Sequence, residues 1–317
     1  MKIGISDNND LKFCRDIKEH WEKEGHEVRY ERGTSEYLAQ WADIYYIDFA
    51  DNNLAYLFKL YHSDSGVSRP GNWDNNKKPL VVVRAIDWEI WTLAMHRDQA
   101  IVDWVDKWIC IAPHIEKKLR AEANFRHGQL ELIRPGINLE KFTLKTTKTD
   151  GYQIGMVLGD MWWPKNHMGG LEIFNMLGGD KWHLHIRGQH EGGEYWSLMY
   201  EHYIKSRGLE NQVTLYPQVA DMNQWYEQID ILLHPGMKES FCYAVAEALA
   251  KGIKPVIYNF YGAEDIWPRK FLFNDYNEAI RKICEPTLLE PETLRDFIAE
   301  EYRLEKMLKA IDDYLEI

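Results

Sequence analysis

The sequence lacks the features of a secreted, membrane-spanning or DNA-binding protein. It has four cysteines, far apart and without C-x-x-C spacing, which is typical of reduced packing residues in a cytoplasmic protein. No stretch approaches the about 18 consecutive apolar residues of a membrane helix, and no signal-peptide run opens the chain. A formal net charge of -12 provides neither the basic surface that duplex DNA requires nor a polybasic membrane anchor. We therefore expect a cytoplasmic protein with no nucleic-acid partner and at most peripheral membrane contact.

Apolar runs of strand length alternate with helical patterns along the whole chain. The expected strands are 2–6, 25–30, 43–47, 79–85, 108–112, 152–158, 182–188, 213–217, 230–235 and 254–259. Strands that alternate with helices indicate βαβ units and a parallel sheet. A chain of 317 residues is too long for one ordinary core, so the pattern predicts an α/β protein with two doubly wound domains.

The alternation is interrupted once, by a polar segment without periodicity that follows Phe142. We therefore predict a first Rossmann-like domain at 1–142, a linker at 143–150 and a second Rossmann-like domain at 151–290. The remainder, 291–317, has the apolar spacing of a helical tail. In such sheets, ligands bind beyond the carboxyl ends of the strands.

The stretch HPGMKESFCYAVAEALAKG, which begins at His234, combines two acids with the predicted start of a helix. Glu239 lies in the loop after an expected strand, and Glu247 lies inside a helix that should begin between Phe241 and Ala244 and end at Ala250. The first amides of this helix would form an anion site; they belong to Ser240, Phe241, Cys242 and Tyr243. Carboxylates for hydroxyls and amides for a diphosphate suit a nucleotide sugar. Acids on a solvated helix face would give the same spacing, so the rest of the chain has to decide.

The longer stretch KESFCYAVAEALAKGIKPVIYNFYGAED resembles the E-x7-E region of retaining GT-B glycosyltransferases of glycosyltransferase family 4. The matching positions are Pro235, Glu239, Glu247, Ala248, Gly252, Pro255, Val256, Gly262 and Glu264. Weaker likenesses lie in KEGHEVRY, in IRPGINLEKF and in VLGDMWWPKN, so the resemblance covers most of the chain. It implies a GT-B fold, in which two Rossmann-like domains face a cleft and the C-terminal helix crosses back to the first domain.

The resemblance also implies roles for single residues. Glu247 would accept hydrogen bonds from ribose hydroxyls, and Glu239 would hold hydroxyls of the transferred sugar. Lys165 would pair with the diphosphate, where charge develops as the bond to the sugar breaks. Gly262 would lie in the donor-binding turn. No DxD motif appears, so we expect neither a metal nor another cofactor.

The chain departs from the family pattern at three places. The family's diphosphate arginine falls on Asp160, an acid, and Arg187 is the first candidate to replace it. The first-domain histidine falls near Asp87, which would orient the donor sugar in its place, and SDNND replaces a glycine-rich loop. Each residue also has a plainer interpretation: Asp87 as a helix N-cap, Arg187 as the partner of a surface acid, and Asp160 as a turn residue.

The expected reaction is the transfer of a hexose from a nucleoside diphosphate sugar to a hydroxyl acceptor, with retention at the anomeric carbon. The donor would bind the second domain. The acceptor, a saccharide, a lipid-linked molecule or a small molecule, would bind the first. Two alternatives stay open: another GT-B enzyme such as an epimerase, and a sugar-nucleotide binding protein without activity. The sequence indicates neither the base, the sugar, the acceptor nor the oligomeric state.

Overall fold

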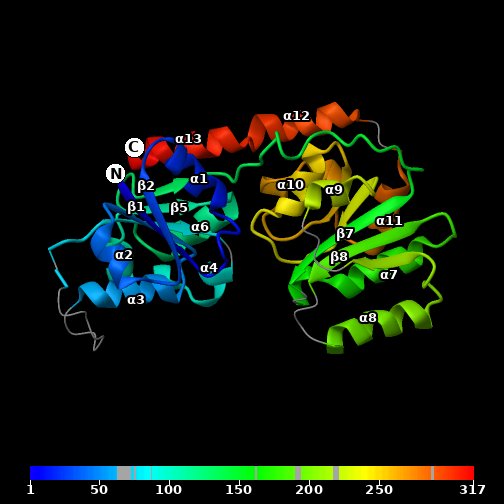
Figure 1. The fold of residues 1–317 in the computed structure, drawn as a ribbon. Helices are drawn as coiled ribbons and strands as arrows, with labels where there is room; N and C mark the ends of the chain where they lie inside the picture. The colour runs from blue at the N-terminus through cyan, green and yellow to red at the C-terminus, as the bar shows by residue number, and fades with distance from the viewer. Residues whose placement is uncertain are drawn as a thin grey trace. The chain divides into compact units, whose positions relative to one another are not determined.

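A computed structural model describes residues 1–62, 73–74, 76–86, 88–160, 163–189, 194–216, 221–286 and 289–317. The chain divides into two compact units (Figure 1). Unit 1 comprises Met1–Pro135 with Glu305–Ile317, and unit 2 comprises Gly136–Leu304. Among the described residues, no helix has the length and apolar character that a membrane crossing requires.

Unit 1 is built on a six-stranded parallel sheet in the order β2-β1-β3-β4-β5-β6. Its strands are β1 (Lys2–Asp7), β2 (Glu27–Arg32), β3 (Ile44–Asp48), β4 (Leu80–Ala85), β5 (Lys107–Cys110) and β6 (Leu130–Leu132). Its helices are α1 (Arg15–Lys23), α2 (Glu36–Trp41), α3 (Asn52–Tyr61), α4 (Trp88–Thr92), η1 (Met95–Arg97), α5 (Gln99–Trp104), α6 (Pro113–Glu122) and most of α13 (Leu304–Leu315). The strand order reverses between β1 and β3, which is the switch point where doubly wound sheets place their ligands.

Unit 2 repeats this plan with a second parallel sheet in the order β12-β11-β10-β7-β8-β9. Its strands are β7 (Gln153–Asp160), β8 (His183–Gln189), β9 (Val213–Tyr216), β10 (Ile231–His234), β11 (Lys254–Tyr258) and β12 (Leu272–Phe273). Its helices are η2 (Trp163–Lys165), α7 (His167–Leu177), α8 (Glu194–Ser206), α9 (Met222–Tyr226), α10 (Tyr243–Ala250), η3 (Ala263–Asp265), η4 (Arg269–Phe271), α11 (Tyr276–Cys284) and α12 (Pro291–Glu301). Here the switch point lies between β7 and β10.

These sheets confirm the predicted fold class of two Rossmann-like α/β domains. The ten expected strands all form, and the structure adds the short edge strands β6 and β12, which the apolar pattern did not reveal. The predicted return of the C-terminal helix to the first domain also holds, because α13 belongs to unit 1. Its Asp312 bonds His20 of α1 at 2.6 Å and the indole N–H of Trp21 at 2.9 Å.

The core of unit 2 explains why apolar and polar residues alternate along strand β8. Leu184 and Ile186 of β8 are buried in an apolar cluster with residues of α7, α8 and α11, while His183 and His185 alternate with them. In a strand, alternate residues point to opposite faces, so β8 buries one face and carries polar groups on the other. The His183 and His185 rings bond Thr214 and Tyr216 of β9, which agrees with a packing role.

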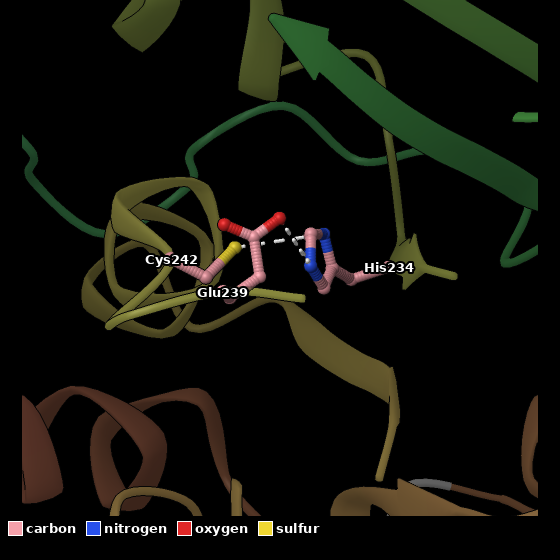
Figure 2. A group of neighbouring side chains, drawn as sticks. All are labelled: His234, Glu239 and Cys242. Carbon is pink, nitrogen blue, oxygen red and sulfur yellow. Dashed lines mark hydrogen bonds and ion pairs between the residues drawn. The ribbon is translucent and has the colours of Figure 1, made fainter. Parts of the chain in front are cut away.

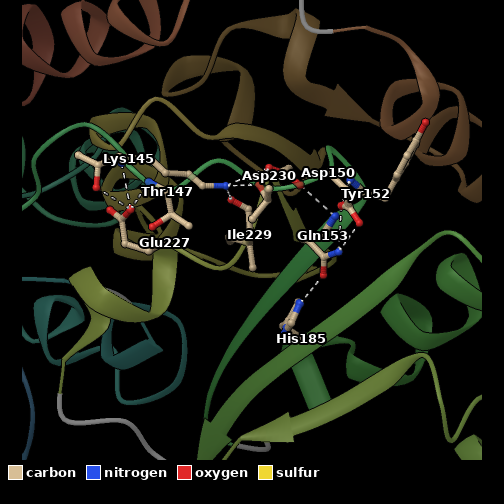
Figure 3. Close-up of polar contacts among 11 residues, drawn as sticks. Lys145, Thr147, Asp150, Tyr152, Gln153, His185, Glu227, Ile229 and Asp230 are labelled. Atoms are coloured by element: carbon tan, nitrogen blue, oxygen red, sulfur yellow. Dashed lines mark hydrogen bonds and ion pairs between the residues drawn. The ribbon is translucent and has the colours of Figure 1, made fainter.

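The predicted linker, 143–150, has no regular structure but is bound to unit 2 by a polar network (Figure 3). The Lys145 ammonium donates to the Ile229 carbonyl at 2.7 Å and to Asp230 at 2.9 Å. The Glu227 carboxylate accepts from the backbone N–H groups of Thr146 and Thr147. Before this segment, the Ile137 backbone bonds the backbone of Tyr302 and Leu304, so unit 2 begins ahead of the predicted linker and includes helix α12 of the predicted tail.

Candidate functional site

The site in unit 2 begins where β10 ends. Pro235 follows the strand, and helix α10 begins at Tyr243 and ends at Ala250, as the sequence predicted. The N-cap of α10 is Cys242, whose φ of 71° places it in the left-handed region, and no side chain caps the helix. Because helix N-termini carry partial positive charge, this turn favours an anion.

Glu239 lies in the loop between β10 and α10 and is buried, with 7% of its surface exposed. Both of its oxygens accept from the Lys165 ammonium, at 2.7 and 2.9 Å. His234, the last residue of β10, lies with its Nε2 atom 3.2 Å from the same carboxylate. The structure therefore brings together the predicted residues Glu239 and Lys165 and adds His234, which the sequence analysis did not select.

Lys165 reaches Glu239 because hydrogen bonds hold the loop after β7 against the loop after β10. Strands β7 and β10 are neighbours in the sheet, so their carboxyl ends lie at the switch point. The Asn166 side chain donates to the Pro235 carbonyl at 3.2 Å, and the Met237 N–H donates to the Pro164 carbonyl at 2.7 Å. These two bonds hold η2, which carries Lys165, against the loop that carries Glu239.

Burial and charge act on the pKa of Glu239 in opposite directions. Burial raises the pKa, whereas the positive charges of Lys165 and His234 lower it, and the net result is a pKa of about 2. For His234, burial lowers the pKa, but its contacts with Cys242 and Glu239 raise it well above the ordinary value. Lys165 and His234 both lie against this carboxylate and favour its ionised form.

Glu247 lies one helical turn from the end of α10 and is half-buried. Its carboxylate accepts a hydrogen bond of 2.9 Å from the Tyr226 hydroxyl of α9. Burial raises the pKa of Glu247 to about 7, although Tyr226, Lys141 and Arg187 each lower it. The Glu247 carboxylate can thus accept hydrogen bonds from hydroxyl groups, and its own charge changes near neutral pH.

The remaining predicted residues occupy different surroundings. The Phe241 side chain is buried in an aromatic cluster with Trp267 and Tyr302, with ring centroids 5.2 and 4.9 Å away, so only its backbone is available to a ligand. Ser240 and Tyr243 are partly exposed beside it. Gly262, with φ of 91°, caps η3 after strand β11, in a conformation that favours glycine.

Arg187 and the two unusual acids complete the predicted set. Arg187 lies in β8, beside Val157 of β7, and its charge acts on Glu247 and Tyr226. Asp160 ends β7 at a register shift, opposite Gln189, and its side chain lies outside the described residues. Asp87 lies outside them as well.

Two residues of the site were missed by sequence reasoning, for different reasons. His234 carried a signal, because it is a polar residue at the end of an apolar strand and directly precedes the loop of Glu239. Tyr226 carried none, because its hydroxyl reaches Glu247 only through the packing of α9 against α10. His234, Glu239 and Cys242 also place a nitrogen, an oxygen and a sulfur atom within 4.8 Å of one another (Figure 2).

Comparison with known proteins gives this geometry a context. Residues 141–304, more than half of the chain, match the family model described as glycosyl transferases group 1. Protein CapJ of Staphylococcus aureus is 21% identical over 175 residues, which cover 54% of this chain and 42% of CapJ. The chain therefore spans less than half the length of that relative.

Solved structures share the fold over nearly the whole chain. Alr3699/HepE of Anabaena, in complex with UDP and glucose, has a TM-score of 0.76 at 15% identity, covering 100% of this chain and 99% of that one. The sucrose-phosphate synthase of Thermosynechococcus elongatus has a TM-score of 0.75 at 12% identity, covering 100% and 98%. At such low identity, these likenesses establish the fold alone.

Proposed function

Because the chain belongs to the family of group 1 glycosyl transferases, and is therefore a glycosyltransferase, we propose that it transfers a hexose from a nucleoside diphosphate sugar to a hydroxyl acceptor. We place it among the retaining, metal-independent enzymes of glycosyltransferase family 4. The observation that carries the proposal is the pairing of Lys165 with the buried Glu239 at the switch point, with Glu247 on the helix that follows.

The donor would bind unit 2 along the loop after β10 and helix α10. Ribose hydroxyls donate to Glu247, and hydroxyls of the sugar donate to Glu239. The diphosphate receives N–H groups from the first turn of α10 and from Lys165. An ammonium has three N–H donors, so Lys165 can bond a phosphate oxygen and Glu239 together. Arg187 and Gly262 complete the proposed donor site.

In the transfer step, the bond between the anomeric carbon and the diphosphate oxygen breaks as the acceptor oxygen bonds the same carbon. The acceptor's proton passes to the departing diphosphate. Lys165 and the α10 amides stabilise the negative charge that develops on the leaving group, which lowers the barrier because this charge is largest in the transition state. Attack and departure on one face of the sugar retain the anomeric configuration. The acceptor is a saccharide, a lipid-linked molecule or a small molecule.

Ligand screening and product analysis test the proposed function. Nucleoside diphosphates and their sugars should raise the unfolding midpoint, because a ligand of the native state stabilises it. The best donor should then transfer its sugar to an acceptor, with an α-linked donor giving an α-linked product by NMR and with full activity in a chelator. Inversion would contradict the retaining mechanism, and an epimerised donor without transfer would contradict the proposed reaction.

We expect Glu247→Gln to weaken binding of the donor by about 1–3 kcal/mol, the usual cost of losing a hydrogen bond to a charged group. The wild type should also bind the donor more tightly at pH 8 than at pH 6. The pKa of this carboxyl is raised to about 7, so the carboxylate that accepts ribose hydroxyls is lost as the pH falls through that value. Isothermal titration with an intact nucleotide sugar measures both effects, since its diphosphate does not titrate in this range.

The glutamine variant also serves as the control for the pH dependence, because its amide cannot titrate. Its affinity should be low and should not change between pH 6 and pH 8. If the affinity of the variant for the donor changes with pH as much as that of the wild type, a group other than Glu247 titrates. Unchanged affinity in a folded variant would remove Glu247 from the ribose site.

A further inference from the structure

The cluster of His234, Glu239 and Cys242 has a chemistry that the proposed transfer reaction does not use. Figure 2 shows the three side chains pointing toward one another, the imidazole from the end of β10 and the other two from the loop and the helix start that follow. Imidazole, carboxylate and thiolate are the ligands that Zn²⁺ prefers in proteins. We propose that these three residues form a binding site for Zn²⁺, and that occupation of the site prevents Glu239 from binding the sugar donor, a consequence that rests on the proposed function.

The distance between the Cys242 sulfur and His234 Nδ1 fits a tetrahedral ion. Zinc bonds of about 2.3 Å to sulfur and about 2.0–2.1 Å to nitrogen place these ligand atoms about 3.6 Å apart at the tetrahedral angle. The Cys242 sulfur lies 3.5 Å from His234 Nδ1, whereas Glu239 lies 3.2 Å from the other ring nitrogen, Nε2. One ligand atom of each residue lies within 4.8 Å of the other two, so a short movement of these side chains brings all three to one ion. Three protein ligands leave one position open for water or substrate, as in zinc sites that are not purely structural.

Zinc binds a thiolate and a neutral imidazole nitrogen, so any proton on the Cys242 sulfur or on the ligating nitrogen of His234 passes to the solvent as the ion enters. Zinc binding would displace the Lys165 ammonium from at least one oxygen of Glu239, and the Lys165 side chain, which is 29% exposed, is near enough to the solvent to be hydrated once displaced.

The local backbone holds the ligands in this arrangement. Cys242 has φ of 71°, a conformation that disfavours side chains with a Cβ and in which glycine would be more stable. At Gly236 a Cβ would come within 2.9 Å of both His234 Nε2 and Glu239 Oε1, so only glycine lets the loop approach them. Position 242 thus carries a thiol although its backbone conformation favours glycine. Position 236 carries glycine, which leaves space for the side chains of His234 and Glu239.

Metal titration of the apoprotein tests the site without reference to the sugar donor. The wild type should bind one Zn²⁺ in competition with a chromophoric chelator, and Co²⁺ should give a thiolate-to-cobalt charge-transfer band. Cys242→Ala should weaken zinc binding on the order of 10–100-fold or more, since loss of even an outer partner of a metal ligand costs that much. Cys284→Ala is the matched control, because this exposed cysteine lies at the end of α11, outside the proposed site. Its loss should leave the zinc affinity of the protein unchanged.

Three results would overturn the proposal: no zinc binding by the wild type, binding lost in the Cys284 variant rather than in the Cys242 variant, or a cobalt complex without the thiolate band. The cobalt spectrum needs only the wild type, so the test stands even if Cys242→Ala does not fold. In a transfer assay, Zn²⁺ should inhibit the wild type and the Cys284 variant, whereas Mg²⁺ should not. Zinc binding without inhibition would contradict the proposed block of donor binding and would leave the proposed transfer reaction intact.

Discussion

Lys165→Ala should lower kcat for sugar transfer by roughly 10²–10³-fold, the effect of removing one preorganised donor from a developing negative charge. The reason lies in the contacts of the ammonium, which holds both oxygens of Glu239 at 2.7 and 2.9 Å and lies at the switch point beside the start of α10. Its cation acts most strongly on charge that grows as the diphosphate departs. KM for the donor should therefore change much less than kcat.

Steady-state kinetics of the variant against the wild type measure this split. Lys309→Ala is the control, because Lys309 also pairs with a carboxylate at 2.7 Å but is 74% exposed on α13. That variant should keep the wild-type kcat, since an exposed pair contributes little. A Lys165 variant in which KM rises and kcat does not change would show that Lys165 binds the donor without acting on the transition state.

The sequence selected the residues that we propose for the donor site, but it did not predict how they contact one another. The E-x7-E spacing and the Lys165-Asn166 pair selected Glu239, Glu247 and Lys165, because these short motifs carry their own signal. The ion pair between Lys165 and Glu239 depends on the pairing of β7 with β10, which are separated in sequence by two further strands. Local periodicity predicts strands, but neighbours in a sheet are set by packing across the whole unit.

The same limit applies to buried polar groups in unit 1. Arg84 stands inside the apolar stretch PLVVVRA, where an arginine signals a buried partner. The sequence does not say which acid is that partner. The structure identifies Asp48 at the end of β3, because β3 and β4 are neighbours and their registers align these two residues.

Arg84→Met should lower the free energy of unfolding of unit 1 by about 3–5 kcal/mol, the usual cost of removing one partner from a buried ion pair. Arg84 is 2% exposed and Asp48 is fully buried. The guanidinium donates to the carboxylate at 2.6 and 3.1 Å and to the Phe13 carbonyl at 2.7 Å. Methionine fills the space but leaves Asp48 without the cation beside it, and Asp7 lies close enough to add repulsion.

The pH dependence of this variant follows from the same contacts. Burial raises the pKa of the Asp48 carboxyl, and the Arg84 guanidinium opposes that rise. Without Arg84 the pKa of the folded state increases further above that of the unfolded state. A carboxyl with a raised pKa favours the folded state at low pH and loses that contribution as the pH rises through the folded pKa. The stability deficit of Arg84→Met should therefore be smaller at pH 5 than at pH 8.

Urea unfolding, together with hydrogen exchange of the β3 and β4 amides, reports this loss for unit 1. Arg32→Met is the matched control, since Arg32 pairs with Asp10 at 3.5 Å with both side chains about two-thirds exposed, and its loss should cost no more than about 1 kcal/mol. Arg84→Met combined with Asp48→Leu should recover most of the stability, because apolar side chains can replace a buried pair when both charges are removed. If the single variant is as stable as the wild type, the pair contributes nothing. If the double variant recovers nothing, the loss arises from the Phe13 bond or from packing instead of from the unpaired carboxylate.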